Sequence, residues 1–124
     1  MADKNIVKNK KAERRRRRVR GKIFGTPECP RLTVSRSLKN VTVQIIDDEK
    51  MITLVGLASN SKDMLKDLKD TDKKTETARK VGIKIAELAK GKGIEKVVFD
   101  RNQYRFHGRI KAIAEGARKG GLKF

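Results

Sequence analysis

Several residue types are scarce in this sequence of 124 residues. It has one cysteine, Cys29, one histidine, no tryptophan and only 4% aromatic residues. A single cysteine cannot form an internal disulfide or a thiolate metal cage. No run of about 18 apolar residues is present to span a bilayer, and no apolar segment follows the first charges to make a secretory signal. We therefore expect a cytoplasmic protein that holds neither a metal nor another cofactor.

Acidic residues are also few compared with basic ones. The chain has 33 Lys and Arg against 15 Asp and Glu, a net charge of +18. This exceeds what solubility requires and predicts a polyanionic partner. An acidic membrane would call for a hydrophobic anchor or for a basic helix with aromatic residues on its other side, and the sequence has neither. A nucleic acid, whose phosphates bind Lys and Arg as counterions are released, is the expected partner.

Half of this charge lies in the first 22 residues. They contain eleven Lys and Arg against two acidic residues, a net charge of +9. With few large apolar side chains, this arm cannot offset the entropy of ordering by burial, so we expect it to be mobile or weakly helical alone. Residues 21–30 hold two Gly and two Pro and predict a hinge. We divide the chain into a basic arm, 1–24, and one domain, 25–124.

Three segments with β-branched residues follow the hinge, at 31–35, 41–46 and 51–59, and predict strands. The short polar links 37–40 and 47–50 predict antiparallel turns between them. On the first two strands, alternation gives one apolar and one polar face. The expected buried residues are Leu32, Val34, Val41, Val43 and Ile45, and the expected polar face carries Thr33, Ser35, Thr42 and Gln44.

Apolar spacing in the second half predicts two helices and one strand. The first helix covers 73–90, with Asp72 as a possible N-cap and Gly91 or Gly93 as its end. A strand at 97–99 and a helix at 108–119 follow, and Leu122 and Phe124 are expected to pack on the core. The inward positions are Ala78, Val81, Ile85, Leu88 and Ala89, then Ile110, Ile113, Ala114 and Ala117.

Two smaller features complete the pattern of helices. Residues 60–72 are polar, with Met64, Leu65 and Leu68 able to hold a short helix capped near Asn60 or Ser61. Gly82 lies inside the helix at 73–90, where glycine costs about 1 kcal/mol relative to alanine. We interpret Gly82 as a sign that this helix packs closely on the sheet.

These elements predict an α/β fold in the order β-β-β-α-β-α. A helix between two strands of one sheet implies a right-handed crossover to a parallel neighbour, so the fourth strand should lie beside the first. The result is a mixed sheet of about four strands in the order 3-2-1-4, with its helices mainly on one face. The polar face stays available for a partner, and a flexible basic N-terminal arm precedes the domain.

Four motifs, and the end of the chain, match a known family in the same order. They read GTPECPRLTVSRS at 25–37, QIIDD at 44–48, KGIEKVVFDR at 92–101, YRFHGRI at 104–110 and ARKGGLKF at 117–124. The sequence resembles the bacterial L-eighteen family of large-subunit ribosomal proteins. The resemblance implies a structural protein without catalysis, monomeric when free and cytoplasmic on the ribosome. It also implies binding to 5S rRNA, attachment of that RNA to 23S rRNA in the central protuberance, and contact with neighbouring large-subunit ribosomal proteins.

The resemblance also implies an RNA-binding surface made of three parts. These are the basic arm, the polar face of the sheet with its first turn, and the loop that leads into the last helix. The corresponding residues are Arg14, Arg15, Arg16, Arg17, Arg18, Arg20 and Lys22; Arg31, Arg36, Ser37, Lys39, Asn40, Thr42 and Gln44; and Arg101, Tyr104, Arg105, His107 and Arg109.

The sequence departs from the family pattern at several of these positions. The family often has an aromatic residue or His where Ser35 and Thr42 stand, and His at Asn40. A base stacked on a ring contributes about 1–3 kcal/mol, so this chain should depend more on phosphate contacts and on hydroxyl or amide hydrogen bonds. Asn102 and Gln103 replace a Gly-rich turn, and of the two Asn is better suited to a positive φ.

Other interpretations of the same residues remain open from the sequence. A sequence-indifferent basic nucleic-acid-binding protein or RNA chaperone would need only the charge. A small nuclease could use His107 and Asp100, although no nucleophile or metal set accompanies them; Asp100 more simply orders Arg101 or caps the last helix. Of the alternating Tyr104 and Phe106, one should point inward and the other outward, and we predict that Tyr104 faces RNA.

Overall fold

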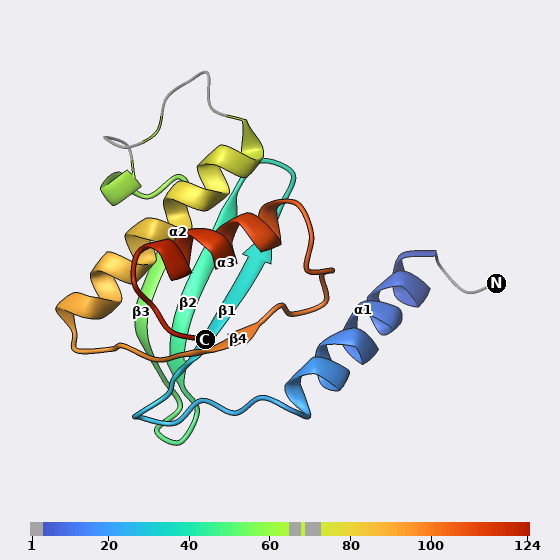
Figure 1. Ribbon diagram of the computed structural model, residues 1–124. Coiled ribbons are helices and arrows are strands. Elements are labelled where there is room, and N and C mark those ends of the chain that lie inside the picture. Colours follow the sequence, from blue (N-terminus) through green and yellow to red (C-terminus); the bar gives the residue numbers. More distant parts are fainter. Residues whose placement is uncertain (1–3, 65–67, 69–72) are drawn as a thin grey trace.

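The computed structural model describes residues 4–64, 68 and 73–124 (Figure 1). Its four strands form one sheet in the order β3-β2-β1-β4. β1 pairs with β2, and β2 with β3, in antiparallel fashion, whereas β4 runs parallel to β1. The predicted mixed sheet is thus confirmed. The elements are α1 (Lys4–Arg20), β1 (Arg31–Arg36), β2 (Val41–Asp47), β3 (Ile52–Ala58), a short 3-10 helix (Lys62–Met64), α2 (Lys74–Gly91), β4 (Val98–Asp100) and α3 (Arg109–Lys119).

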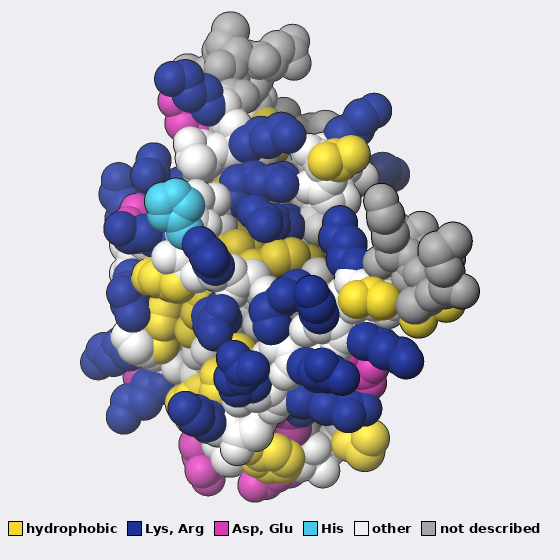
Figure 2. All heavy atoms as spheres, turned by 90° about the vertical axis from the view of Figure 1, so that its right-hand side faces the viewer, with side chains coloured by type: hydrophobic (Ala, Val, Ile, Leu, Met, Phe, Trp, Pro, Cys, Tyr) yellow, Lys and Arg dark blue, Asp and Glu magenta, His cyan; other side chains and the backbone are white. Residues whose placement is uncertain are grey.

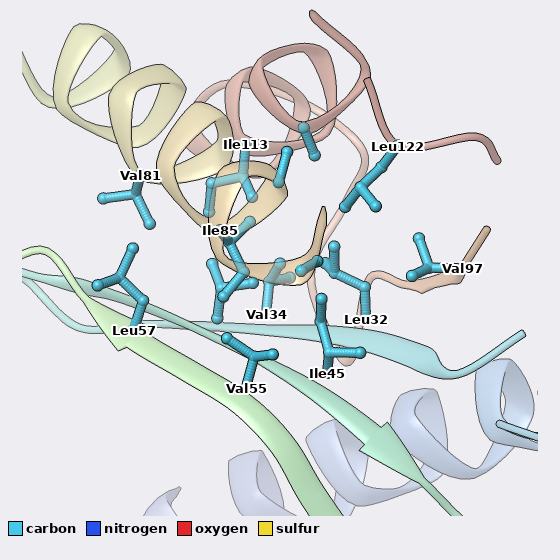
Figure 3. Close-up of a cluster of buried hydrophobic side chains, with 14 of the residues drawn as sticks. Leu32, Val34, Ile45, Val55, Leu57, Val81, Ile85, Val97, Ile113 and Leu122 are labelled. Atoms are coloured by element: carbon cyan, nitrogen blue, oxygen red, sulfur yellow. The ribbon is translucent and has the colours of Figure 1, made fainter. Parts of the chain in front are cut away.

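Helices α2 and α3 cover one face of the sheet and enclose the core with it (Figure 3). All five residues predicted to point inward from β1 and β2 are at most 2% exposed. On α2 and α3 every predicted inward position is buried except Leu88, which is partly buried against the core. Leu122 is buried and Phe124 stacks on Phe99, with ring centroids 5.5 Å apart. The alternation and helical spacing therefore predicted the core correctly.

The edges of some elements differ from prediction. β4 begins at Val98 rather than 97 because the Val97 amide donates to the carbonyl of Lys123, in the C-terminal segment, at 3.1 Å. Only residues 62–64 of the predicted short helix at 60–72 are helical in the described part, where Met64 is buried. Leu65 and the predicted cap Asp72 lie outside the described residues. The amide of Lys73, just before α2, donates to the Glu76 carboxylate at 3.3 Å.

The close approach at Gly82 is between α2 and α3. The interpretation of Gly82 as a contact with the sheet is therefore wrong, although α2 does cover the sheet. A Cβ on Gly82 would lie 2.2 Å from the Ile113 carbonyl oxygen, and one on Gly116 would lie 2.1 Å from the Arg79 carbonyl oxygen. The two helix backbones therefore touch through glycines on both sides. Helical spacing showed that Gly82 was on the inner side, but not which neighbour it met.

The arm forms the helix α1, where the sequence predicted a mobile or weakly helical segment. Lys and Arg are good helix formers, and Glu13 accepts a hydrogen bond from Arg17 one turn later at 2.6 Å. Within the described part of α1 only Ala12 is buried. The helix ends at Arg20, just before the predicted Gly- and Pro-containing hinge. It lies on the side of the sheet opposite to α2 and α3 (Figure 3).

An ionic cluster around Arg31 connects the hinge, the sheet and the loop after β4. The Arg31 guanidinium donates two hydrogen bonds to Asp48 (3.0 and 3.2 Å) and one to Asp100 (2.7 Å). Asp48 also accepts from the Gly25 amide at 2.8 Å and from Arg20 at 3.3 Å. The side chains of Arg31, Asp48 and Asp100 are only 12%, 11% and 2% exposed. These ion pairs are therefore shielded from solvent, and the attraction within each is stronger than in a pair exposed on the surface.

The cluster shifts the pKa of two of its members. Burial by itself would raise the pKa of Asp48, but hydrogen bonds from Arg31 and the Gly25 amide, with the charges of Arg31 and Arg20, outweigh it. The pKa of Asp48 is therefore held below its ordinary value of 3.8. For Arg31, burial would lower the pKa, and the bonds to Asp48 and Asp100 raise it overall.

The contact between α2 and α3 predicts a stability change. Gly82→Ala should lower the free energy of unfolding by about 1–3 kcal/mol, because the added methyl group must push the two helices apart. This cost exceeds the gain in helix propensity when alanine replaces glycine. Gly91→Ala is the matched control, since a Cβ there meets nothing within 4 Å. Urea unfolding of both variants checks this. Equal stability of the two variants would show that the helices are not in backbone contact.

The Asp48 pKa predicts a pH dependence. Because the folded-state pKa is lowered, the stability that ionised Asp48 contributes is present above about pH 3.8 and is lost as the pH falls through the folded-state pKa. Asp48→Asn should be less stable than the parent by about 1–3 kcal/mol at pH 7, and the gap should narrow below pH 3.8. Glu115→Gln, at an exposed pair with Arg79, should show a small gap throughout. A constant Asp48→Asn gap from pH 7 to pH 2 would contradict the assignment.

Candidate nucleic-acid interface

A groove of about 500 Å³ lies between α1 and the open face of the sheet, which is the face that α2 and α3 do not cover. Many Lys and Arg side chains are spread over the side of the molecule on which α1 lies (Figure 2). The arm arginines Arg14 to Arg18 are all exposed, and Arg16 donates to the Gln103 side chain at 2.6 Å. The residues that line the groove are Glu13, Arg16, Arg17, Arg20, Arg31, Thr33, Asp100 and Asn102.

A second hollow, of about 310 Å³, continues along the same face of the sheet. It shares Thr33 and Asn102 with the groove, so the two form one surface. Its walls carry hydroxyl and amide groups, as the alternation predicted, and none of its lining residues is aromatic. The lining residues are Thr33, Val34, Ser35, Thr42, Gln44 and Asn102. We call the groove and this hollow together the open-face surface.

The loop after β4 is shaped by Asn102, which has a positive φ of 61°. Its amide nitrogen donates to the Val34 carbonyl at 3.1 Å, and its backbone amide donates to Asp100 at 2.8 Å. Arg101 donates to the Tyr104 carbonyl at 2.6 Å. Asn102, rather than Gln103, thus has the positive φ, as expected from the tolerance of asparagine for this conformation. The sequence placed Asn102 in the loop but did not reveal that it borders both hollows.

Tyr104 connects this loop to the end of β1. Its hydroxyl accepts from the Arg36 amide at 3.2 Å and donates to the Arg36 carbonyl at 3.3 Å, while the Arg36 guanidinium lies 4.9 Å from the ring centroid. Tyr104 is half-buried against the core, whereas Phe106 is 44% exposed and forms a T-shaped ring pair with Phe99. The more outward ring is therefore Phe106, and the expected orientation is wrong on this point. The hydroxyl bonds that pin Tyr104 were not visible in the spacing.

Two predicted site residues are turned inward by their contacts. Arg31 uses its donors within the ionic cluster, and Arg101 uses its guanidinium to close the loop. In contrast, Arg36, Arg105 and His107 are exposed, as are Lys22, Ser37 and Gln44. Arg20 is partly turned inward too, since it bonds to Asp48 and to the Ile23 carbonyl. The structure therefore separates freely presented cations from cations with a structural partner.

A third hollow, of about 150 Å³, lies apart from the open-face surface. It combines two predicted residues, Lys39 and Arg109, with Lys74 of α2, which sequence reasoning missed. Nothing in the local sequence around Lys74 distinguishes it from other lysines of the helix. The lining residues are Lys39, Val41, Ser59, Lys74, Thr77 and Arg109.

Asp100 is buried and bonded to other residues of the fold. It is 2% exposed, and both its oxygens accept hydrogen bonds, from Arg31 and from the Asn102 amide.

In the described residues no group of three or more His, Cys, Asp or Glu could hold a metal ion. None of the helices described is long and apolar enough to cross a bilayer.

Comparison with known proteins gives a consistent family. Residues 6–124 match the family described as ribosomal L18 of archaea, bacteria, mitochondria and chloroplast. The large ribosomal subunit protein uL18 of Chloroherpeton thalassium is 54% identical over 112 residues, which are 90% of this chain and 92% of that protein. That of Anaeromyxobacter sp. is 52% identical over 90% of this chain and 93% of its own length. That of Caldicellulosiruptor saccharolyticus is 50% identical over 98% and 97% of the two chains.

These matches confirm the resemblance seen in the motifs and exclude the nuclease interpretation, since proteins of this family are structural parts of the ribosome. They place the chain on the ribosome, with ribosomal RNA and other ribosomal proteins around it. The chain belongs to the ribosomal L18 family and is a structural constituent of the large ribosomal subunit.

Proposed function

We propose that this protein binds 5S rRNA and helps to attach it to 23S rRNA in the central protuberance of the large subunit. The observation that carries the proposal is the open-face surface, to which the basic arm, the polar strands and the loop after β4 all contribute. One RNA segment lying in it would touch all three parts at once. We expect the free protein to be a monomer.

The arm supplies the electrostatic part of this binding. Five consecutive arginines are exposed on α1, and their planar guanidinium groups can hold phosphate with two parallel hydrogen bonds. The arm contacts the domain mainly through polar groups, such as Arg16 with Gln103 and Arg20 with Asp48. Phosphate oxygens can replace such partners, so α1 can move onto RNA at a small cost in buried apolar area.

The sheet supplies contacts of a different kind. Ser35 and Gln44 are exposed and Thr42 is half-buried, and their hydroxyl and amide groups can both donate and accept hydrogen bonds. Such groups suit the 2′-hydroxyls and base edges that RNA presents. Selectivity for one RNA would then come from the shape of the open-face surface and from these hydrogen bonds.

The competing function is sequence-indifferent nucleic-acid binding, which the net charge of +18 alone would support. It predicts similar affinity for any polyanion of similar size. The two functions differ in the importance of the neutral polar groups on the sheet, which charge-driven binding does not use.

Selectivity for 5S rRNA is the first test. At moderate salt the protein should bind 5S rRNA at least tenfold more tightly than tRNA or duplex DNA, which corresponds to about 1.4 kcal/mol. The triple variant Ser35→Ala, Thr42→Ala, Gln44→Ala should lose most of this preference, because it removes hydrogen bonds without changing charge. Equilibrium filter binding measures both. Equal affinity of the unaltered protein for all three nucleic acids would refute the proposal.

A charge-preserving control uses two exposed polar residues away from this face of the sheet, Asn60→Ala and Thr75→Ala. It keeps the same charge and should retain the preference for 5S rRNA. If it lost as much as the sheet variant, the loss would not be specific to the open-face surface.

The contribution of the arm can be measured from salt dependence. Changing Arg14 to Arg18 to Gln, which keeps good helix propensity, should reduce the slope of log affinity against log salt by up to about 3.5, at about 0.7 per phosphate contact. An unchanged slope would show that the arm points into solvent in the complex.

The control for the arm removes the same charge elsewhere. It changes five exposed lysines to Gln: Lys50, Lys90, Lys96, Lys119 and Lys123. Its slope should stay close to that of the unaltered protein. An equal fall in both variants would favour sequence-indifferent binding through bulk charge.

A further inference from the structure

The third hollow lies where three separate parts of the chain meet. The turn between β1 and β2, the start of α2 and the start of α3 come together at one end of the molecule (Figure 1). Each part contributes one cation: Lys39 from the turn, Lys74 from α2 and Arg109 from α3. Residues separated by up to 70 positions in sequence thus line one space of about 150 Å³.

Among the residues that the structure describes, these three cations have no acidic partner. In the described part of the chain, none of Lys39, Lys74 and Arg109 forms an ion pair or a side-chain hydrogen bond. The groove under α1 is different, because its arginines share it with Glu13 and Asp100. Like charges that face one space repel each other. An anion in the third hollow would relieve this repulsion.

The floor of the hollow is held in a fixed shape. The Ser59 hydroxyl accepts from the Val41 amide at 3.1 Å and donates to the Asn40 side chain at 2.9 Å, so both its functions are used. The Thr77 hydroxyl has no partner among the described residues and can donate to a ligand. The first turns of α2 and α3 add partial positive charge, which favours an anion further.

The chemistry of the lining favours phosphate over a carboxylate. A carboxylate is planar and is satisfied by one guanidinium fork. Here the donors come from three elements and surround the space, which suits a tetrahedral group with several acceptor oxygens. The hollow is also small, with room for a compact anion rather than for a nucleotide base stacked on a ring.

We propose that Lys39, Lys74 and Arg109 form a pocket that binds one phosphate group of the RNA. The inference rests on the proposed RNA-binding function and adds a contact on the other side of the sheet. Val41, which lines the pocket, points to the core face that α2 and α3 cover, whereas the open-face surface lies on the opposite face. RNA that occupies both sites must therefore pass around the β1–β2 end of the domain.

The test measures the salt dependence of 5S rRNA binding by the full chain. The triple variant Lys39→Gln, Lys74→Gln, Arg109→Gln should lower the slope of log affinity against log salt by about 0.7–0.9, the value for one phosphate. The control Lys90→Gln, Lys96→Gln, Lys119→Gln removes the same charge from exposed positions outside the pocket and should leave the slope unchanged. An equal slope for the pocket variant and the control would overturn the proposal. A fall in the slope that corresponds to two or more phosphate contacts would overturn it as well.

Phosphate ethylation of the RNA gives an independent readout. In the unaltered complex, ethylation at one phosphate should block binding, and this block should vanish in the Lys74→Gln variant while blocks at open-face contacts remain. RNA with and without a 5′-terminal phosphate distinguishes a terminal group from an internal phosphodiester. If no block depends on Lys74 while 5S rRNA still binds selectively, the pocket proposal fails and the RNA-binding function stands. If the unaltered protein showed no selectivity for 5S rRNA, the proposed RNA-binding function itself would be rejected.

Discussion

The ionic cluster centred on Arg31 is the constraint on which the open-face surface depends. One guanidinium connects Asp48, which directly follows β2, to Asp100, at the end of β4, and Asp48 also holds the hinge through the Gly25 amide. Removing one carboxylate from this cluster leaves shielded donors without a hydrogen-bond partner and costs about 1–3 kcal/mol. The cluster therefore fixes where the arm leaves the domain and where the loop after β4 begins. Arg31 lines the groove, but its guanidinium donors are used within the cluster.

The cations of this protein fall into two groups with different roles. Those that have partly buried carboxylate or carbonyl partners, such as Arg31 and Arg101, hold the fold together. Those that do not, such as Arg36 and Arg105, are exposed and give the surface its positive field. Some of the acidic residues order neighbouring backbone, as Asp47 does for the amides of Glu49 and Lys50. A polyanion can bind the second group while Arg31 and Arg101 keep their partners within the fold.

The sequence was sufficient to predict the sheet order and the core because those follow from periodicity and from the handedness of crossovers. It was not sufficient where partners are distant in sequence. Arg31 looks like any exposed arginine until Asp48 and Asp100 are placed beside it, and Lys74 becomes relevant only when the β1–β2 turn lies next to α2. Tyr104 and Phe106 show the same limit, since the hydrogen bonds of Arg36 decide which ring is held.

The glycine contact between α2 and α3 has a consequence for how such a sequence can change over generations. At Gly82 and Gly116 any added side chain would meet backbone atoms of the other helix, and backbone cannot be replaced by a compensating mutation. Two neighbouring core side chains can exchange volume with each other, but these two positions cannot. The Lys and Glu positions on the outer sides of the helices can vary with little effect on stability. Divergence should therefore accumulate on the solvent side, while the spacing of the helices stays the same.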